Sequence, residues 1–193
     1  MTIMTDKAHY ESHLEAYIVQ KLQAQGWVVG QSKHYHTEYA LYPQDLITWI
    51  QATQPQKWQK LTALNGSNTE KRIIDRLDEE LNKKGTIHIF RNGFSMAGAG
   101  TIDLGESAPE DGRNQAVIDR YNANILRVVP QLKYHPSKDA GILDLVFFIN
   151  GLPMATVEIK NHFTGQTVNE AMEQYRTSRD PKELLFQFKK RAL

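Results

Sequence analysis

Three charged residues at the ends of two apolar segments could together perform metal-dependent chemistry. Asp144 precedes the apolar run LVFFI, and Glu158 and Lys160 lie in the following run ATVEIK. Glu158 and Lys160 are two apart, so on a strand their side chains emerge on one face. Two carboxylates suit Mg²⁺, and a nearby lysine can orient or deprotonate an attacking water. The set predicts metal-assisted phosphodiester hydrolysis, whereas the alternative interpretation is charged strand ends that face solvent.

The register of the hairpin decides whether Asp144 and Glu158 can meet. We expect strands at 142–149 and 154–160, joined by a turn at Asn150–Gly151. A clean two-residue turn would place Asp144 across from Val157, with its side chain on the opposite face from Glu158. One additional residue, in the loop or in a β-bulge, would instead pair Asp144 with Glu158. The candidate site therefore predicts a bulge or an odd-length loop in this hairpin.

The composition indicates a globular domain without a disulfide framework. The chain has 193 residues, 23 of them basic and 22 acidic, and its formal net charge of +1 neither favours nor excludes nucleic-acid binding. It contains no cysteine, which excludes thiolate metal sites and is typical of a reducing cytoplasm. The start of the chain has no signal-peptide pattern, and no apolar run approaches membrane-spanning length. We expect a single cytoplasmic α/β domain over 1–193, with no membrane partner.

Hydrophobic periodicity predicts the helices that surround this hairpin. The first is expected at 6–25, with Asp6 as its N-cap and Gly26 as its stop. Two further helices are expected within 44–64, broken at Pro55, because proline lacks the backbone donor and crowds the preceding turn. Additional helices are predicted at 69–84 and near 114–122.

Other segments carry strand and capping signals. TIHIF at 86–90 alternates like a strand. The segment NILRVVPQLKYH is β-branched but contains Pro130, which predicts an edge strand or a bulge. Thr167 and Glu170 form a capping box for a later helix, and the tail that starts at Asp180 begins one more.

The run LDLVFFINGLPMATVEIKN, followed by TGQT and EAMEQY, closely resembles the amino-terminal nuclease domain of type I restriction enzyme R subunits. The likeness extends upstream through RNGF and NILRVVPQLKYH to the opening helix that ends in GW. It implies a restriction-endonuclease-like fold of the PD-(D/E)xK type, in which a mixed β-sheet is flanked by α-helices. It also implies a Mg²⁺-dependent endonuclease that hydrolyses DNA phosphodiester bonds, and Mn²⁺ is expected to substitute.

The resemblance gives roles to individual residues. Leu143-Asp144 stands where such nucleases have Pro-Asp, so Asp144 and Glu158 would be metal ligands and Lys160 the catalytic lysine. Glu15, in the first helix, matches the acidic residue that often supports the metal-bound water in this superfamily.

A Gln-x-x-x-Tyr motif on the helix after E-x-K is present in many members of the superfamily. This chain has Tyr175, but the position four before it is Ala171, while Gln174 is adjacent. The resemblance therefore implies Gln174 and Tyr175 as contacts to DNA beside the catalytic residues, in an altered form of the motif.

The R subunits of this family continue into an ATP-driven translocase. This chain contains no G-x-x-x-x-G-K-[ST] phosphate loop, so we expect no ATP site and an amino-terminal fragment of a larger motor subunit. The resemblance implies double-stranded DNA as the substrate. It implies the methylation and specificity subunits of a restriction complex as partners through the full-length R subunit, with sequence recognition and translocation located elsewhere.

Alternative functions follow from other features of the chain. One is a noncatalytic DNA-binding or subunit-docking domain that retains the nuclease scaffold. Another is a zinc hydrolase that uses His9 and His13, although no third ligand is evident. Six basic residues of two predicted helices could line a DNA groove or form a solvated surface: Lys57, Lys60, Lys71, Arg72, Lys83 and Lys84.

Overall fold

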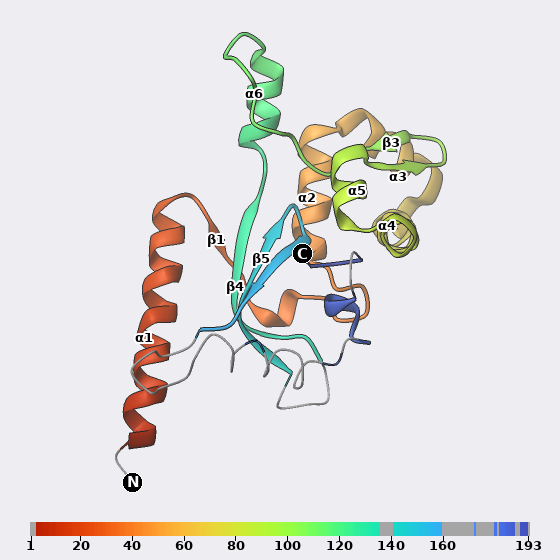
Figure 1. Ribbon diagram of the computed structural model, residues 1–193. Helices are drawn as coiled ribbons and strands as arrows, with labels where there is room; N and C mark the ends of the chain where they lie inside the picture. Colours follow the sequence, from red (N-terminus) through yellow and green to blue (C-terminus); the bar gives the residue numbers. More distant parts are fainter. Residues whose placement is uncertain are drawn as a thin grey trace.

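A mixed β-sheet flanked by α-helices forms the centre of the computed structural model, which confirms the predicted α/β class (Figure 1). The structure describes residues 3–135 and 141–159, together with Met172, Asp180, 182–187 and 190–192. Its main sheet has the order β1-β4-β5-β6, in which β1 and β4 are parallel and the other pairs antiparallel. The strands are β1 (Val28–Val29), β4 (Leu126–Lys133), β5 (Ile142–Ile149) and β6 (Leu152–Val157).

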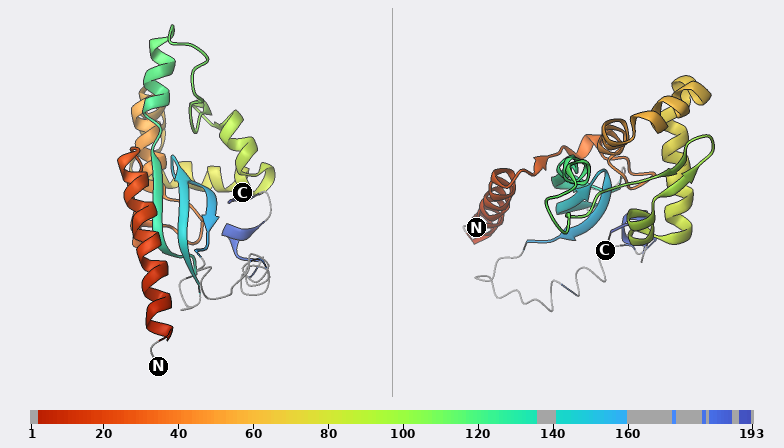
Figure 2. Two further views of the ribbon diagram at one scale, coloured as in Figure 1. Left: turned by 60° about the vertical axis from the view of Figure 1, so that its left-hand side comes forward. Right: turned by 90° about the horizontal axis from the view of Figure 1, so that it is seen from above.

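Helix α1 (Ile3–Ala24) packs beside the sheet, where its apolar stripe contacts Val128 of β4 and Leu145 of β5 (Figures 1 and 2). The stripe consists of Leu14, Ile18, Val19 and Leu22. The predicted helix is confirmed, but it begins before Asp6, so Asp6 lies within the helix and is not its N-cap. Its end agrees with the prediction, because Gly26 follows it with a left-handed φ of 89°.

A group of helices packs at the other side of the sheet, far from α1 (Figure 2). Its members are α2 (Pro43–Thr53), α3 (Pro55–Asn65), α4 (Thr69–Lys84) and α5 (Thr86–Asn92), with the hairpin β2 (Phe94–Met96) and β3 (Gly100–Ile102). The predicted break at Pro55 is confirmed, since α3 begins at this proline, where its missing N–H is tolerated. Two short 3-10 turns, η1 (Ser32–His34) and η2 (Gly66–Asn68), lie in the connections.

The strand predicted at 86–90 is wrong, because this segment forms the start of α5. Ile89 is fully buried in the same apolar cluster as α4, Phe90 packs against that cluster, and Thr86 is also buried. These three positions have the i, i+3, i+4 spacing of a helix, which over so few residues coexists with an alternating pattern. Packing against α4 decides between the two.

Strand β4 is an interior strand, so the edge position predicted from Pro130 is wrong. Proline is tolerated here because β1 pairs only with Arg127 and Val128 and ends before it. The irregularity that Pro130 also predicted lies one residue later, at Gln131, whose φ is 48°. Upstream of β4, α6 (Gln115–Asn122) projects from the body of the molecule, as Figure 1 shows, and none of its residues is buried.

A buried ion pair joins the sheet to the helical group. The Arg127 guanidinium on β4 donates from Nε and Nη2 to the two carboxylate oxygens of Asp45 on α2, at 2.5 and 2.7 Å. The side chains are 11 % and 3 % exposed, respectively. The guanidinium also lies 4.4 Å from the ring centre of Tyr42. This bidentate contact fixes β4, and with it the candidate site, relative to α2.

The described part of the tail returns to the helical group. The 3-10 turn η4 (Leu184–Phe186) packs on the sheet, and the fully buried Arg191 pairs with Asp78 of α4. The helix predicted in the tail is represented here only by η4, and the capping box of Thr167 and Glu170 lies outside the described residues. Among the helices that the structure describes, none combines the length and the apolar character required to span a membrane.

Candidate active site

The β5–β6 hairpin contains the bulge that the candidate site requires. Ile149 pairs with Leu152 across a two-residue turn, so the loop itself is not of odd length. Phe148 pairs with Pro153 but Phe147 with Ala155, which makes Met154 the extra residue of a β-bulge. The shifted register continues to Leu145 and Val157, the last pair of the ladder. The next positions along the two strands are Asp144 and Glu158, the combination that a clean hairpin would have prevented.

Asp144 contacts the segment that follows β6. Its Oδ2 accepts a hydrogen bond of 2.6 Å from the backbone N–H of Ile159. Asp144 is half-buried, whereas Ile159 is buried in the apolar cluster under α1. Glu158 therefore lies between Val157, the last paired residue of β6, and Ile159, whose backbone N–H donates to Asp144. Glu158 itself is half-buried. The two acidic residues predicted from the sequence thus follow the last pair of the ladder, but among the described residues Glu158 does not line the pocket that contains Asp144.

Gln131 lies across from Asp144 on β4, the strand that pairs with β5 on the edge opposite β6. The pairs Pro130–Leu145 and Leu132–Leu143 flank this position, and Gln131 itself is left-handed. Its side-chain Nε2 is 2.5 Å from Oε2 of Glu15 and 3.5 Å from Oδ1 of Asp144. One amide group thereby links a carboxylate of α1 to a carboxylate of β5.

The alternation of the sheet changes at this position. Leu145 packs in the apolar cluster under α1, whereas Leu143 packs in the cluster on the other side of the sheet. Residues two apart on a regular strand share a face, so the regular pattern is interrupted at Asp144, opposite the left-handed Gln131. The interruption allows Asp144 to reach the α1 side of the sheet next to Leu145.

Glu15 lies in the site because α1 buries the flanking residues Leu14 and Ile18 against the sheet. Burial raises the pKa of the Glu15 carboxyl above its usual value, the hydrogen bond from Gln131 lowers it, and the charge of Asp144 raises it further. A pocket of about 340 Å³ is lined by Glu11, Ser12, Glu15, Gln131, Asp144 and Ile159. The structure therefore brings Glu15 and Asp144 to one pocket.

Three of the residues predicted for the site lie outside the described part of the chain: Lys160, Gln174 and Tyr175. Their predicted roles stay predictions. Sequence reasoning missed Gln131, together with the pocket residues Glu11 and Ser12. The one signal for Gln131 was the neighbouring Pro130. It predicted an irregular strand but did not identify the residue whose backbone adopts the left-handed conformation.

The donor atoms of the pocket suit a hard cation. Glu15 and Asp144 offer carboxylate oxygens whose mutual repulsion contributes to the raised pKa of Glu15. Mg²⁺ binds to one or two carboxylates and keeps several waters, so such a pair is sufficient for it. Over the residues that the structure describes, no three acidic or histidine side chains are grouped so as to hold a metal by themselves. This gives no support to a zinc site at His9 and His13. Of these two histidines, only the side chain of His13 is described, and it is exposed.

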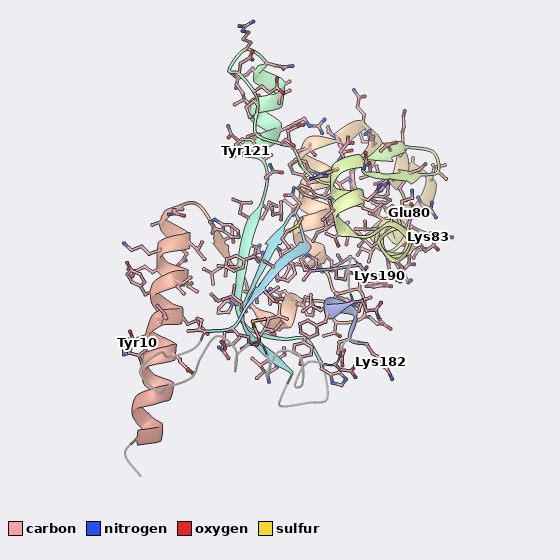
Figure 3. All side chains as sticks on the ribbon, viewed as in Figure 1. Tyr10, Glu80, Lys83, Tyr121, Lys182 and Lys190 are labelled. Carbon is pink, nitrogen blue, oxygen red and sulfur yellow. The ribbon has the colours of Figure 1, made fainter. Side chains whose placement is uncertain are left out.

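The basic residues of α4 lie on the far side of the sheet from the candidate site. Figure 3 shows Glu80 and Lys83 on α4 within the helical group, far from Tyr10 on α1. Lys71 and Lys84 are paired within the helix, with Asp75 and Glu80, at 2.7 Å each. These residues agree better with the solvated-surface interpretation than with a DNA groove at the site.

A comparison with protein families finds a match over most of the chain. The family model described as the type I restriction enzyme R protein N terminus matches residues 10–190, nearly the whole chain. The matched range includes all the residues predicted for the site, from Glu15 to Tyr175. Searches of curated proteins and of solved structures gave no match.

Proposed function

We propose that this chain, which belongs to the family of type I restriction enzyme R protein N termini, is a Mg²⁺-dependent endonuclease domain that hydrolyses phosphodiester bonds of double-stranded DNA. The observation that carries the proposal is the bulge at Met154. Because of it, the register that ends at Leu145–Val157 leads on to Asp144 and Glu158. In a regular ladder of the same sequence, Asp144 would instead lie across from Val157, and the two carboxylates would be directed to opposite faces of the hairpin.

The proposed roles follow from the position of each residue. Asp144 and Glu158 would hold Mg²⁺, and Glu15 would support the attacking water from α1. Mg²⁺, when bound, would stabilise the charge that develops on the phosphate oxygens. Lys160 would orient the water and accept its proton, while the water oxygen attacks phosphorus in line and the P–O3′ bond breaks. The leaving 3′ oxygen takes up a proton, and the products are a 5′-phosphate and a 3′-hydroxyl.

The chain's partners are part of the same proposal. Double-stranded DNA is the proposed substrate, and sequence recognition would lie in the specificity subunit of a restriction complex. The methylation and specificity subunits would contact this domain through the full-length R subunit, whose motor would decide where DNA is cut. A nuclease controlled in this way can be silent when isolated, so metal binding is a better first test than cleavage.

The test is the binding of Mn²⁺ by calorimetry, in the presence and absence of a short DNA duplex. The wild type is compared with Asp144→Asn, which keeps the side-chain shape but removes the charge. Asp119→Asn serves as the matched control, because Asp119 is an exposed carboxylate on α6 that accepts a hydrogen bond from Gln115.

Binding in the wild type and in Asp119→Asn, together with its loss in Asp144→Asn, would support the nuclease proposal. Nicking of supercoiled plasmid DNA in Mn²⁺, with the same dependence on Asp144, would add the reaction itself. Binding that Asp144→Asn leaves unchanged, or no binding in any variant, would contradict it. The noncatalytic DNA-binding or docking domain would then be the better interpretation.

A further inference from the structure

A single amide group lies between two carboxylates of the candidate site. Nε2 of Gln131 is within hydrogen-bonding distance of Oε2 of Glu15, at 2.5 Å, and of Oδ1 of Asp144, at 3.5 Å. An amide NH₂ has two donor hydrogens, so it can serve both acceptors at once. The nitrogen therefore occupies the space between two oxygens that come from different elements, α1 and β5.

The backbone of Gln131 is held in an unusual conformation that places the amide there. Its φ of 48° lies in the left-handed region, which is unfavourable for residues other than glycine, asparagine and aspartate. The strand remains paired on both sides, at Pro130 and Leu132, so the conformation is confined to one residue. Gln131 is exposed, so burial of its side chain does not explain the position. A strained residue beside a candidate active site points to a role in that site.

We propose that Gln131 is a positioning residue whose amide occupies the space between Glu15 and Asp144 that the metal ion and the attacking water would fill, and that the amide is displaced when the ion binds. This inference rests on the proposed function and deepens it. The N–H group competes with the cation for the Asp144 oxygen, since both are electropositive, and with the attacking water for the Glu15 oxygen, since both are hydrogen-bond donors. The amide keeps two like-charged groups together without a full charge of its own, so it is easier to displace than a lysine.

Two substitutions at this position should change metal binding in opposite directions. Gln131→Met preserves the length of the side chain and removes the donor, so the ion no longer displaces a hydrogen bond. Mn²⁺ should then bind about tenfold more tightly, the change that corresponds to one hydrogen bond to a charged group. Gln131→Lys places a full positive charge between the carboxylates and should weaken binding by about a hundredfold.

The stability of the metal-free protein provides an independent readout. Gln131→Met should melt at a lower temperature than wild type in EDTA, because Glu15 and Asp144 lose their shared donor. In saturating Mn²⁺ this difference should shrink, since the amide is displaced in the wild type too. A purely structural role would lower the melting temperature equally in both conditions.

The experiment is a calorimetric titration of the 193-residue chain with Mn²⁺ at about pH 8, where carboxylates are ionised. Gln115→Met is the matched control, because Gln115 also donates to a carboxylate, Asp119 at 2.7 Å, but on the exposed α6. We expect tighter binding in Gln131→Met, weaker binding in Gln131→Lys and no change in Gln115→Met.

Two results would overturn the inference while leaving the proposed function in place. Unchanged binding in Gln131→Met would show that the amide does not compete with the ion. Weaker binding in that variant would show that Gln131 contributes a favourable contact in the metal-bound state. Absence of Mn²⁺ binding in the wild type would instead remove the proposed function and this inference together.

Discussion

The backbone N–H of Ile159 donates a hydrogen bond of 2.6 Å to Oδ2 of Asp144. This bond holds the segment that follows β6 against β5, next to the last pair of the ladder. The contact depends on the register beyond the bulge, in which Leu145 pairs with Val157. The relation between the two strands, more than the turn that joins them, therefore decides whether the acidic residues can act together.

Deletion of Met154 should preserve Mn²⁺ binding. Met154 is the extra residue of the bulge, so its removal leaves a regular hairpin in which Asp144 still lies across from Glu158. Its side chain packs against the apolar cluster of the helical group, so we expect a loss of about 1–3 kcal/mol in the free energy of unfolding. Calorimetry and urea unfolding measure the two quantities separately.

Insertion of one alanine between Thr156 and Val157 should have the opposite effect on binding. The insertion would place Asp144 across from Val157 and turn Glu158 to the other face. Because β6 is the last strand of the sheet, the insertion should cost little more stability than the deletion. If the insertion variant bound Mn²⁺ as well as the deletion variant did, register would not control the site.

Glu15→Gln should stabilise the metal-free protein at neutral pH. The pKa of the Glu15 carboxyl is raised in the folded protein, chiefly by burial, so the folded state binds this proton more tightly than the unfolded state. The resulting stabilisation is present below the usual pKa of 4.5 and is lost as the pH rises through the folded pKa. Glutamine removes this dependence.

Urea unfolding in EDTA at several pH values measures the effect. We expect the free energy of unfolding of Glu15→Gln to exceed that of the wild type by less than about 1 kcal/mol at pH 7, because solvent partly screens the side chain. The difference should disappear at about pH 4 and below, where the wild-type carboxyl is protonated. Glu110→Gln, in an exposed loop, should show no such trend. A Glu15→Gln variant that is less stable than wild type at pH 7 would contradict the sign expected from the raised pKa of Glu15.

Much of the scaffold was predictable because its signals are local. The apolar stripe of α1, the proline that begins α3 and the Asn150–Gly151 turn each determine structure within a few residues. The requirement that Asp144 and Glu158 share a face even predicted a bulge or an odd-length loop. The structure contains the bulge, but in β6 at Met154 and not in the loop.

The features that the sequence did not reveal depend on contacts between distant segments. TIHIF became a helix because Ile89 is buried against the helical group, a partner that periodicity over five residues cannot identify. Gln131 became part of the site because α1 and β5 each bring a carboxylate to it, from positions 116 and 13 residues away along the chain. No local sequence pattern identifies a glutamine whose backbone adopts the left-handed conformation inside a strand.

Asn150→Ala should strongly destabilise the hairpin. The Asn150 side chain is fully buried and donates to the Leu104 carbonyl and to Asn124, at 2.9 and 2.8 Å, and it accepts from the Ile125 N–H at 2.7 Å. Its φ of 49° is also unfavourable for alanine. We expect a loss of about 3 kcal/mol or more, because buried polar groups are left unsatisfied.

Asn150→Gly separates the two contributions to this loss. Glycine adopts the left-handed backbone without strain but restores none of the hydrogen bonds. Its free energy of unfolding should fall between those of Asn150→Ala and the wild type. A glycine variant as stable as the wild type would show that the buried amide contributes nothing and that backbone conformation explains the whole effect.

Arg127→Met should be the most destabilising of these substitutions. The guanidinium is paired with both oxygens of Asp45, and its removal leaves a buried carboxylate without a partner. Breaking one side of a buried pair costs about 3–5 kcal/mol. Urea unfolding measures the loss in the free energy of unfolding. We expect no proportional fall in Mn²⁺ affinity, because the Arg127–Asp45 pair lies on the side of β4 that faces α2.

The double variant Arg127→Met, Asp45→Leu tests the physical reason. If the loss arises from an uncompensated charge, removing the second charge should recover most of it, because two apolar side chains of similar volume can fill the same space. If the double variant is as unstable as Arg127→Met, the contribution comes instead from contacts that the guanidinium alone makes. Its position 4.4 Å from the ring of Tyr42 is then the first to consider. The size of the recovery therefore separates charge pairing from packing at the junction that fixes β4, and the site with it, relative to α2.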